Sequence, residues 1–425
     1  MNAQISGYQT QAIAATSAIK WLADLQSKAL EVFLNLGFPT RTDPLWKYTS
    51  LATFLNESFM VQAPDMDQLQ HPMMPLPLDS KEVIVSTGVV LPFQVDLPPG
   101  VIIMPVLQAI EDHPDKVRPY LGQLINYDNS ILAWNMAMLL HGVFVYVPAG
   151  VRIEQPLSIR HTNAVQDQAL HMHHLVVLEA GSSLHLVESY QGTAKTKYMM
   201  NTVTEIFLAP NSVLTHVKLQ QESNLAYHFG HVLVKQAANS IFNGHLVSLG
   251  GLLSRNDTTV VLNEEYSECN LRGLYAPGAG QHMDQHTHVT HAVPNGRSDQ
   301  NYKGVLTGKS RAVFDGLVDV KKDAQHTQAN QQNKNILLSE LSEVNTHPQL
   351  QIDADDVVCT HGATVGQLDP EALFYFAARG VSATQARKHL IQAFIAENIS
   401  AVPGVEFSAW LSSCLMDHLG VEHAL

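Results

Sequence analysis

The chain lacks the features that mark disulfide-rich, membrane-spanning and nucleic-acid-binding proteins. It has only three cysteines, an odd and widely spaced set that cannot form a disulfide framework. It has no uninterrupted apolar run of about 18 residues, and no basic region followed by an apolar core at its N-terminus. Acidic residues outnumber basic residues by 39 to 25, and the net charge of −14 disfavours nucleic acid and anionic membranes as partners. We therefore expect a protein of the reducing cytoplasm.

Charged residues are scarce, at 15% of the chain. This low share indicates that much of the surface lies in stacked or subunit-facing structure. The 425 residues provide enough chain for two or three domains with a large core. A hydrophobic content of 45% and a mean hydropathy of −0.02 are typical of a globular protein.

Common catalytic motifs are absent or incomplete. No Gly-x-Ser-x-Gly element and no Cys-x-x-Cys pair occurs, so there is no hydrolase or redox-motif signature. The segment Gly304–Ser310 resembles a phosphate-binding loop, but three residues separate its glycines where the motif needs four. Residues 311–320 read as a strand, so no helix N-terminus follows to hold a phosphate. We predict that the chain neither binds nor hydrolyses ATP.

His286 and His288 form another partial motif. With Gly280 they match the opening of a cupin metal motif, and strand alternation would put both imidazoles on one face. The glutamate expected four or five residues later is missing, since Ala292 and Val293 occupy those positions. Packed or hydrogen-bonded histidines therefore account better for the pair. A cupin-type metal-dependent enzyme is the alternative.

Strand patterns begin near Val83 and dominate from Val143 to about residue 360, with a weak repeat inside this stretch. A turn, a serine and an alternating strand recur 27 to 31 residues apart, at Ser183, Ser212, Ser240, Ser267 and Ser298. Near-constant spacing without intervening helices is typical of a β-solenoid, in which each coil buries its face on its neighbours. A β-sandwich with hairpins is the alternative. In a solenoid, the amide-rich stretch Gln325–Asn335 would form stacked side-chain ladders.

Helical patterns flank the β stretch. Residues 5–36 read as one helix that ends before Gly37, and residues 61–80 carry four prolines with little periodicity, which indicates a linker. Three short helices follow Gly366. Asp369 and Pro370 would begin the first, and a capping box that starts at Ser382 would begin the second.

The third C-terminal helix carries an apolar stripe that includes Trp410, Leu411 and Leu415. We expect this stripe to be exposed as a docking surface, while a cap on the β core is the other interpretation. The resulting boundaries are 1–60 for an N-terminal helical segment and 61–140 for a proline-rich linker with irregular and β structure. The β-solenoid core would span 141–367, and a C-terminal helical domain 368–425.

Cys359 and His361 are the candidate ligands. They lie two residues apart in a short β-branched run, so a strand would point both side chains to one face. Gly362 and Gly366 would then let the backbone turn into the following helix. A thiolate and an imidazole suit iron or sulfur chemistry. Two ligands cannot fill a four-coordinate site, so further ligands must come from elsewhere in this chain or from another subunit.

Several segments resemble one known family. Residues 358–380 are similar to the C-terminal signature of the SufB/SufD family, the scaffold subunits of SUF iron–sulfur cluster assembly. The Cys-Thr-His-Gly-Ala-Thr form resembles the family's SufD branch. Residues 41–51 resemble its N-terminal Trp-Lys/Arg-Tyr-Thr element, and residues 142–151 and 302–306 resemble two of its strands. Together these segments span about residues 41 to 395.

The resemblance implies a fold, a role and partners. The fold would be mainly β, a right-handed parallel β-helix core flanked by N-terminal and C-terminal α-helical segments. The role would be that of a non-enzymatic scaffold that pairs with SufB. The C-terminal helices, with Trp410, Leu411 and Leu415, would bind SufC, an ABC-type ATPase that carries out the ATP hydrolysis.

The resemblance also implies a site. A nascent iron–sulfur cluster or iron, shared and transient, would form at the interface where a SufB cysteine faces His361, with Cys359 as its neighbour. A homodimer is one possible state of the chain when SufB is absent, and the sequence does not decide whether it forms. The sequence makes no prediction about a flavin, and a purely structural β-solenoid is the third interpretation.

Overall fold

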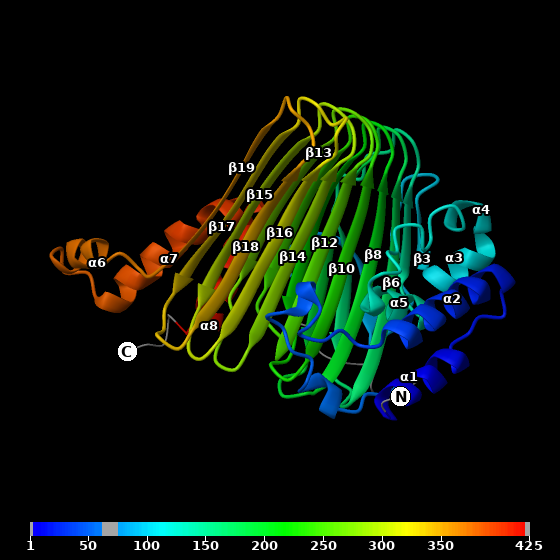
Figure 1. The fold of residues 1–425 in the computed structure, drawn as a ribbon, viewed down its shortest axis with the longest axis horizontal. Helices are drawn as coiled ribbons and strands as arrows, with labels where there is room; N and C mark the ends of the chain where they lie inside the picture. Colours follow the sequence, from blue (N-terminus) through cyan, green and yellow to red (C-terminus); the bar gives the residue numbers. More distant parts are fainter. Residues whose placement is uncertain (1–2, 62–74, 421–425) are drawn as a thin grey trace.

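The computed structural model describes residues 3–61 and 75–420, and its core is a solenoid of two stacked sheets (Figure 1). The ten-stranded sheet contains β1 (Lys81–Ser86), β2 (Val89–Val90), β5 (Leu157–Asn163), β7 (Ser183–Gly192), β9 (Val213–Gln221), β11 (Ile241–Ser248), β13 (Glu268–Tyr275), β15 (Arg297–Leu306), β17 (Gln328–Leu337) and β19 (Val358–Gly366). The nine-stranded sheet contains β3 (Ile102–Pro105), β4 (Val143–Val147), β6 (Gln168–Leu178), β8 (Tyr198–Leu208), β10 (Tyr227–Gln236), β12 (Leu253–Leu262), β14 (His282–His291), β16 (Arg311–Val320) and β18 (Glu343–Ile352).

From β4 to β19 the chain alternates between the two sheets, and each strand pairs in parallel with the strand two positions later. The predicted parallel β-solenoid is therefore confirmed. The β-sandwich alternative is wrong, because hairpins would pair consecutive strands. The cupin alternative is wrong for the same reason, since a cupin jelly roll is built from antiparallel strands.

The coils turn at corners that repeat along the molecule. At one corner, residues with left-handed backbone conformation recur: Gly181, Asn211, Asn239, Tyr266, Asn295 and His326. The next residue in four of these turns is a serine whose hydroxyl donates to the carbonyl three residues earlier: Ser182, Ser212, Ser240 and Ser267. The predicted repeat thus marks real corners at Ser212, Ser240 and Ser267. It is one residue late at Ser183, and Ser298 lies inside β15.

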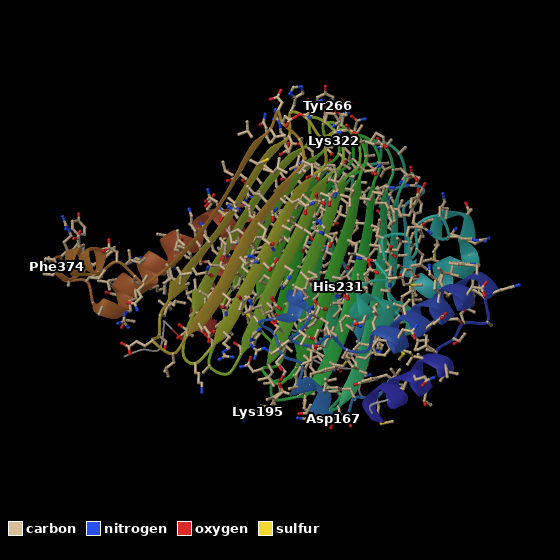
Figure 2. The ribbon with its side chains drawn as sticks, in the orientation of Figure 1. Asp167, Lys195, His231, Tyr266, Lys322 and Phe374 are labelled. Carbon is tan, nitrogen blue, oxygen red and sulfur yellow. The ribbon has the colours of Figure 1, made fainter. Side chains whose placement is uncertain are left out.

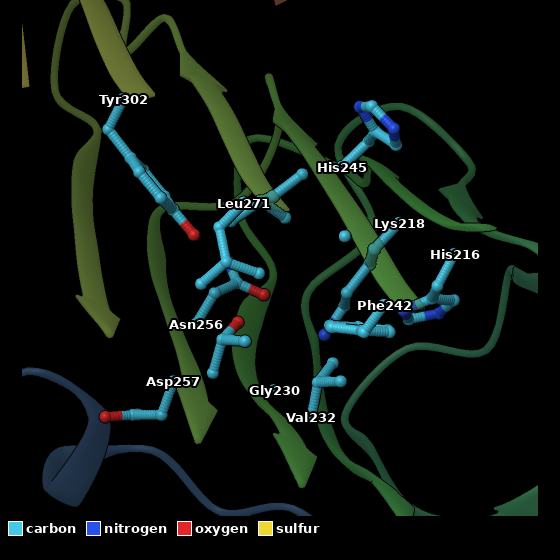
Figure 3. A pocket seen from close by; sticks show the side chains of 13 residues that line it. His216, Lys218, Gly230, Val232, Phe242, His245, Asn256, Asp257, Leu271 and Tyr302 are labelled. Atoms are coloured by element: carbon cyan, nitrogen blue, oxygen red, sulfur yellow. The ribbon is translucent and has the colours of Figure 1, made fainter. Parts of the chain in front are cut away.

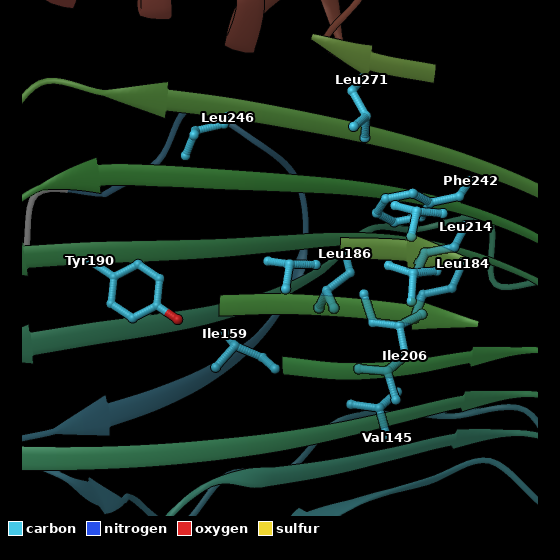
Figure 4. Packing of buried hydrophobic residues seen from close by; sticks show 14 of the residues in the cluster. Val145, Ile159, Leu184, Leu186, Tyr190, Ile206, Leu214, Phe242, Leu246 and Leu271 are labelled. Carbon is cyan, nitrogen blue, oxygen red and sulfur yellow. The ribbon is translucent and has the colours of Figure 1, made fainter. Parts of the chain in front are cut away.

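The solenoid interior is filled by every second residue of each strand. In β7, Leu184 and Leu186 point inward and pack with Leu214 and Phe242 from later coils (Figure 4). A fully buried side chain of this size stabilises the fold by about 1.5–3 kcal/mol. Stacking of equivalent positions explains why no single coil could fold alone.

Helices cover the first coils. These are α1 (Ala3–Ala14), α2 (Lys20–Leu36), α3 (Val106–Asp112), α4 (Pro114–Val117) and α5 (Ser130–Ala137), with short 3-10 turns η1 (Pro44–Trp46) and η2 (Phe54–Asn56). The predicted single helix over 5–36 is wrong, because the chain breaks between α1 and α2. Gln26 stabilises this break, since its side chain accepts from the Ser17 amide at 2.8 Å and donates to the Ala15 carbonyl at 3.1 Å.

Two sequence predictions about loops and amides agree with the structure. Residues 307–310 join β15 to β16, so the strand expected after the phosphate-loop-like segment is confirmed. In β17, Gln331 donates to the side-chain oxygen of its in-register neighbour Gln300 at 3.4 Å, as expected for stacked amides. Other amides of this strand contact different side chains, since Asn330 donates to Asp299 at 2.7 Å and Asn333 donates to the Tyr275 hydroxyl at 2.9 Å. Within the predicted linker, residues 62–74 lie outside the described residues. No helix among the described residues is long and apolar enough to cross a membrane.

Candidate functional site

The solenoid ends at β18 and β19, and no strand of residues 3–61 or 75–420 continues either sheet there. Each is the last strand of its sheet, and among the described residues neither pairs with a further strand beyond. The backbone N–H and C=O groups on that side can therefore accept another strand. Val365 is exposed at this end although its in-register neighbour Asn335 is buried, as expected where the next coil of a stack is missing.

Cys359 and His361 lie on this terminal strand, on the same face, as predicted. Cys359 pairs in register with Ala329 and His361 with Gln331, and both partners are buried inside the solenoid. The two side chains thus continue inward-facing columns, but no coil follows to bury them. Cys359 is half-buried and His361 is exposed. Partial burial raises the pKa of the Cys359 thiol, so a nearby cation or metal is needed to favour the thiolate.

The backbone beyond these residues differs from the prediction. No turn occurs at Gly362, because β19 continues in register with β17 as far as Gly366. The predicted start of the next helix is confirmed, since the Asp369 carboxylate accepts from the Glu371 amide at 2.9 Å and Pro370 is the first residue of α6 (Pro370–Ala377). The extra strand length keeps Cys359 and His361 on a rigid sheet edge.

The stripe of Trp410, Leu411 and Leu415 is not the exposed surface that we predicted. In α8 (Val405–His418), Leu411 and Leu415 are completely buried, and Trp410 is partly buried and stacks on Phe407. They pack on the outer face of the ten-stranded sheet, against residues such as Leu219. The prediction is wrong because an amphipathic stripe shows that a surface must be covered, but not which surface covers it.

The middle C-terminal helix, α7 (Ala383–Ser400), is tied to the same sheet by polar contacts. Its predicted capping residue Ser382 accepts from the Gln385 amide. The buried Asn398 side chain donates to the carbonyls of Gly273 and Asn301, both at 2.8 Å. Lys303 on β15 forms an ion pair with Glu397 at 2.9 Å. These contacts hold α7 and α8 as a cover on the solenoid.

The first C-terminal helix, α6, behaves differently. It lies at the tip of an arm that extends from the body, at the opposite end from the N-terminal helices (Figure 1). Phe374, labelled at this tip in Figure 2, is 75% exposed, and Tyr375 is 56% exposed. α6 has no buried residue. α6 contacts α7, where Phe376 stacks on His389, but the rings of Phe374 and Tyr375 stay exposed and mark an interaction surface.

A second polar site lies inside the solenoid, and our sequence analysis missed it. The buried Glu188 carboxylate lies 3.1 Å from His216 Nε2 and accepts from the Tyr190 hydroxyl at 2.8 Å. Lys218 is the in-register neighbour of Glu188 on β9 and is also buried. A signal was present: Glu188 occupies an inward position in the alternation that begins with Leu184 and Leu186.

Burial and neighbouring charges shift the pKa values of this cluster in opposite directions. Burial alone would raise the pKa of Glu188, but the charge and hydrogen bond of His216 outweigh it and hold the pKa well below its usual range. Burial lowers the pKa of Lys218 to about 8. Figure 3 shows the Lys218 side chain reaching into the cavity that it shares with Gly230 and Asn256. The cavity holds about 20 Å³, room for one water.

Gly230 makes space for the Lys218 ammonium group. A Cβ at position 230 would lie 2.0 Å from Lys218 Nζ and 2.8 Å from Asn256 Oδ1. The glycine therefore serves a close approach inside the solenoid rather than a turn.

Comparison with known proteins gives consistent matches. Residues 160–394 match the family model described as "SUF system FeS cluster assembly, SufBD core domain", and residues 5–159 match the SufBD protein N-terminal region. The chain is 31% identical to the iron–sulfur cluster assembly protein SufD of Escherichia coli, over 88% of this chain and 87% of that protein. It is 26% identical to SufD of Bacillus subtilis, over 90% of each chain. It is 23% identical to SufB of Bacillus subtilis, over 70% of this chain and 64% of that protein.

Proposed function

Because this chain belongs to the SufBD family of iron–sulfur cluster assembly proteins, we propose that it is a scaffold subunit that builds clusters at its contact with a SufB-type subunit. Membership of the family already assigns the chain to cluster assembly, as an assembly protein rather than an enzyme. A purely structural role for the solenoid is thereby set aside. The observation that carries the proposal is the uncovered solenoid end with Cys359 and His361 on its last strand.

The partner is a homologous SufBD chain. A solenoid of the same cross-section can continue both sheets, because β18 and β19 each offer an unpaired edge. The exposed side chain of Val365 would be buried by such an end-to-end contact, as its in-register neighbour Asn335 is buried within the solenoid. SufB proteins match this chain over much of its length, which supports a common architecture for the two partners. A second copy of the chain would occupy the same edge when SufB is absent.

The cargo is iron and a nascent iron–sulfur cluster, held transiently and shared between the two subunits. Cys359 can supply a thiolate and His361 an imidazole, and both are accepted ligands of such clusters. The pair lies on one strand and cannot complete the coordination alone, so the partner must supply the remaining ligands. A cation there would also favour the Cys359 thiolate against the effect of burial.

ATP hydrolysis belongs to a SufC-type ATPase subunit that docks on the C-terminal arm. The exposed Phe374 and Tyr375 of α6 carry this contact, in place of the buried residues of α8. Movement of the ATPase would pull on α6, which is continuous with β19 through residues 367–369. The arm therefore connects the ATPase to the strand that bears Cys359 and His361.

Co-expression tests this function directly. The tagged chain should co-purify with the SufB and SufC homologues of the same organism, and the complex should assemble clusters from iron and sulfide. The chain expressed alone should not retain a cluster. Failure to form a complex with SufB, in the presence of both homologues, would contradict the proposal.

A further inference from the structure

The outer face of the nine-stranded sheet carries a row of alternating histidines and aspartates. The residues are in register on five successive strands of that sheet: His231, Asp257, His286, Asp315 and His347. In-register residues on one face of a sheet are direct neighbours, with strands about 4.8 Å apart. The row is separate from Cys359 and His361, which lie on β19 of the other sheet.

Most of the row lines a groove of about 370 Å³ on the surface of the solenoid. The N-terminal segment around Trp46 and the loop around Asp128 form the other walls. Figure 2 shows His231 at this place, beside the blue N-terminal segment. Partial enclosure reduces solvation of the aspartates, and so strengthens their attraction for a cation.

His286 is already oriented as a ligand. It is 9% exposed, and its Nε2 lies 2.8 Å from Asp284 Oδ1. Asp284 is fixed in turn by the Thr49 hydroxyl at 2.6 Å and by Arg255 at 3.2 Å. Histidine ligands of metals commonly contact a carboxylate with one ring nitrogen and the metal with the other. Because Asp284 contacts Nε2, the remaining nitrogen, Nδ1, is the one that would bind an ion.

Asp315 and His347 supply the other two donors. Asp315 Oδ2 lies 3.0 Å from His347 Nδ1, and Asp315 Oδ1 accepts from the Gln349 amide at 3.0 Å. This contact is a hydrogen bond, and its length near 3 Å also brings the two donor atoms to the separation of adjacent ligands around a metal with bonds of about 2.1 Å. His347 is largely exposed, so its ring can adjust as an ion binds.

From this arrangement, we propose that His286, Asp315 and His347 form a binding site for a first-row divalent metal ion of the Fe²⁺ class. Two imidazoles and one carboxylate are a ligand set that suits such ions. Asp257 and Asp284 add negative charge nearby, against the single positive charge of Arg255. In the described parts of the chain, no three such side chains already surround one point. The ion therefore completes the site by drawing the His347 ring toward His286.

Anaerobic titration of the purified full-length chain with Fe²⁺, and with Co²⁺ as a spectroscopic probe, tests the site. The wild type should bind one ion whose Co²⁺ absorption reports nitrogen and oxygen ligands. His347→Gln and Asp315→Asn should each raise the Kd at least about tenfold. His347 is exposed, so its replacement should leave the melting temperature unchanged.

The controls separate this site from others. His326 and Asp356 form an exposed pair with the same 3.0 Å spacing. The pair does not belong to the proposed site, so the His326→Gln variant should bind Fe²⁺ and Co²⁺ with the Kd of the wild type. A Cys359→Ala/His361→Ala double variant should also keep this ion, whatever the cluster function of those residues. Wild-type protein that binds neither ion, or a His347→Gln variant with unchanged Kd, would overturn the proposal.

Discussion

At the scale of single residues, a substitution of His361 tests its role as a ligand with little effect on packing. It is exposed on β19, so His361→Ala should change the free energy of unfolding by no more than about 0.5 kcal/mol. Cluster formation in vivo should nevertheless fail, because a methyl group cannot replace a ligand nitrogen. The measurement is complementation of a strain that lacks this gene, alongside a melting curve of the purified complex. Full complementation would show that His361 is not a ligand.

Cys359→Ala should have a milder effect than His361→Ala. The thiol is half-buried beside Ala329 and its pKa is raised, so part of its role is packing. We expect reduced but detectable complementation, with a small loss of stability. Complete loss of function with an intact complex would instead make Cys359 the principal ligand.

A substitution of Gly230 tests how tightly the buried polar cluster around Lys218 is packed. Gly230→Ala places a Cβ against the Lys218 ammonium group, and should lower the free energy of unfolding by about 1–3 kcal/mol. Urea unfolding measures this change. Gly362→Ala is the matched control, because a Cβ there meets no atom within 4 Å. Equal stability of the two variants would mean that Lys218 can move aside freely.

Among single residues, the sequence could predict the shared face of Cys359 and His361, because strand alternation fixes direction. It did not predict that Leu411 and Leu415 are buried, since that depends on which surface meets the helix. It could in principle have revealed Glu188, whose charge interrupts an otherwise apolar inward row.

At the scale of elements, substitutions in α8 should lower the free energy of unfolding, whereas substitutions in α6 should leave it nearly unchanged. Leu411→Ala in α8 removes a completely buried side chain and should cost about 2–5 kcal/mol of stability. A Phe374→Ser/Tyr375→Ser variant of α6 should leave stability within about 0.5 kcal/mol, because both rings are exposed. Chemical unfolding of the two purified variants distinguishes them.

The same α6 variant should weaken binding of the SufC-type ATPase. The comparison is with wild type in a direct binding assay, such as calorimetry with the purified ATPase subunit. If the α6 variant binds normally, the docking surface lies elsewhere on the chain.

Elements with local signals were predictable, and elements set by tertiary contacts were not. Asp369–Pro370 and Ser382 mark helix starts because the capping groups lie within a few residues. The break between α1 and α2 depends on Gln26, which also donates to the distant Leu139 carbonyl. Such a contact has no local sequence pattern.

At the scale of the whole molecule, buried histidines make stability depend on pH. Burial lowers the pKa of five of them to about 3 or 4: His171, His174, His231, His245 and His291. In the unfolded chain each would titrate near its ordinary pKa of about 6.5, so the unfolded state binds more protons between about pH 4 and 6.5. Stability should therefore fall as pH drops through this window.

Urea unfolding at several pH values checks this prediction. We expect a loss of at least about 2 kcal/mol between about pH 7 and pH 5. His245→Gln, which removes one of these groups, should make the slope shallower. A stability that is flat over this range would show that these histidines bind protons as readily in the folded state as in the unfolded state.

Hydrogen exchange of the chain, alone and in complex with its SufB-type partner, tests the central claim that the uncovered solenoid end is the assembly interface. We predict that backbone amides of β18 and β19, including residues 358–366, become protected on complex formation, while those of β4 and β6 do not change. A stable complex in which the amides of β19 exchange as fast as in the free chain would contradict this account.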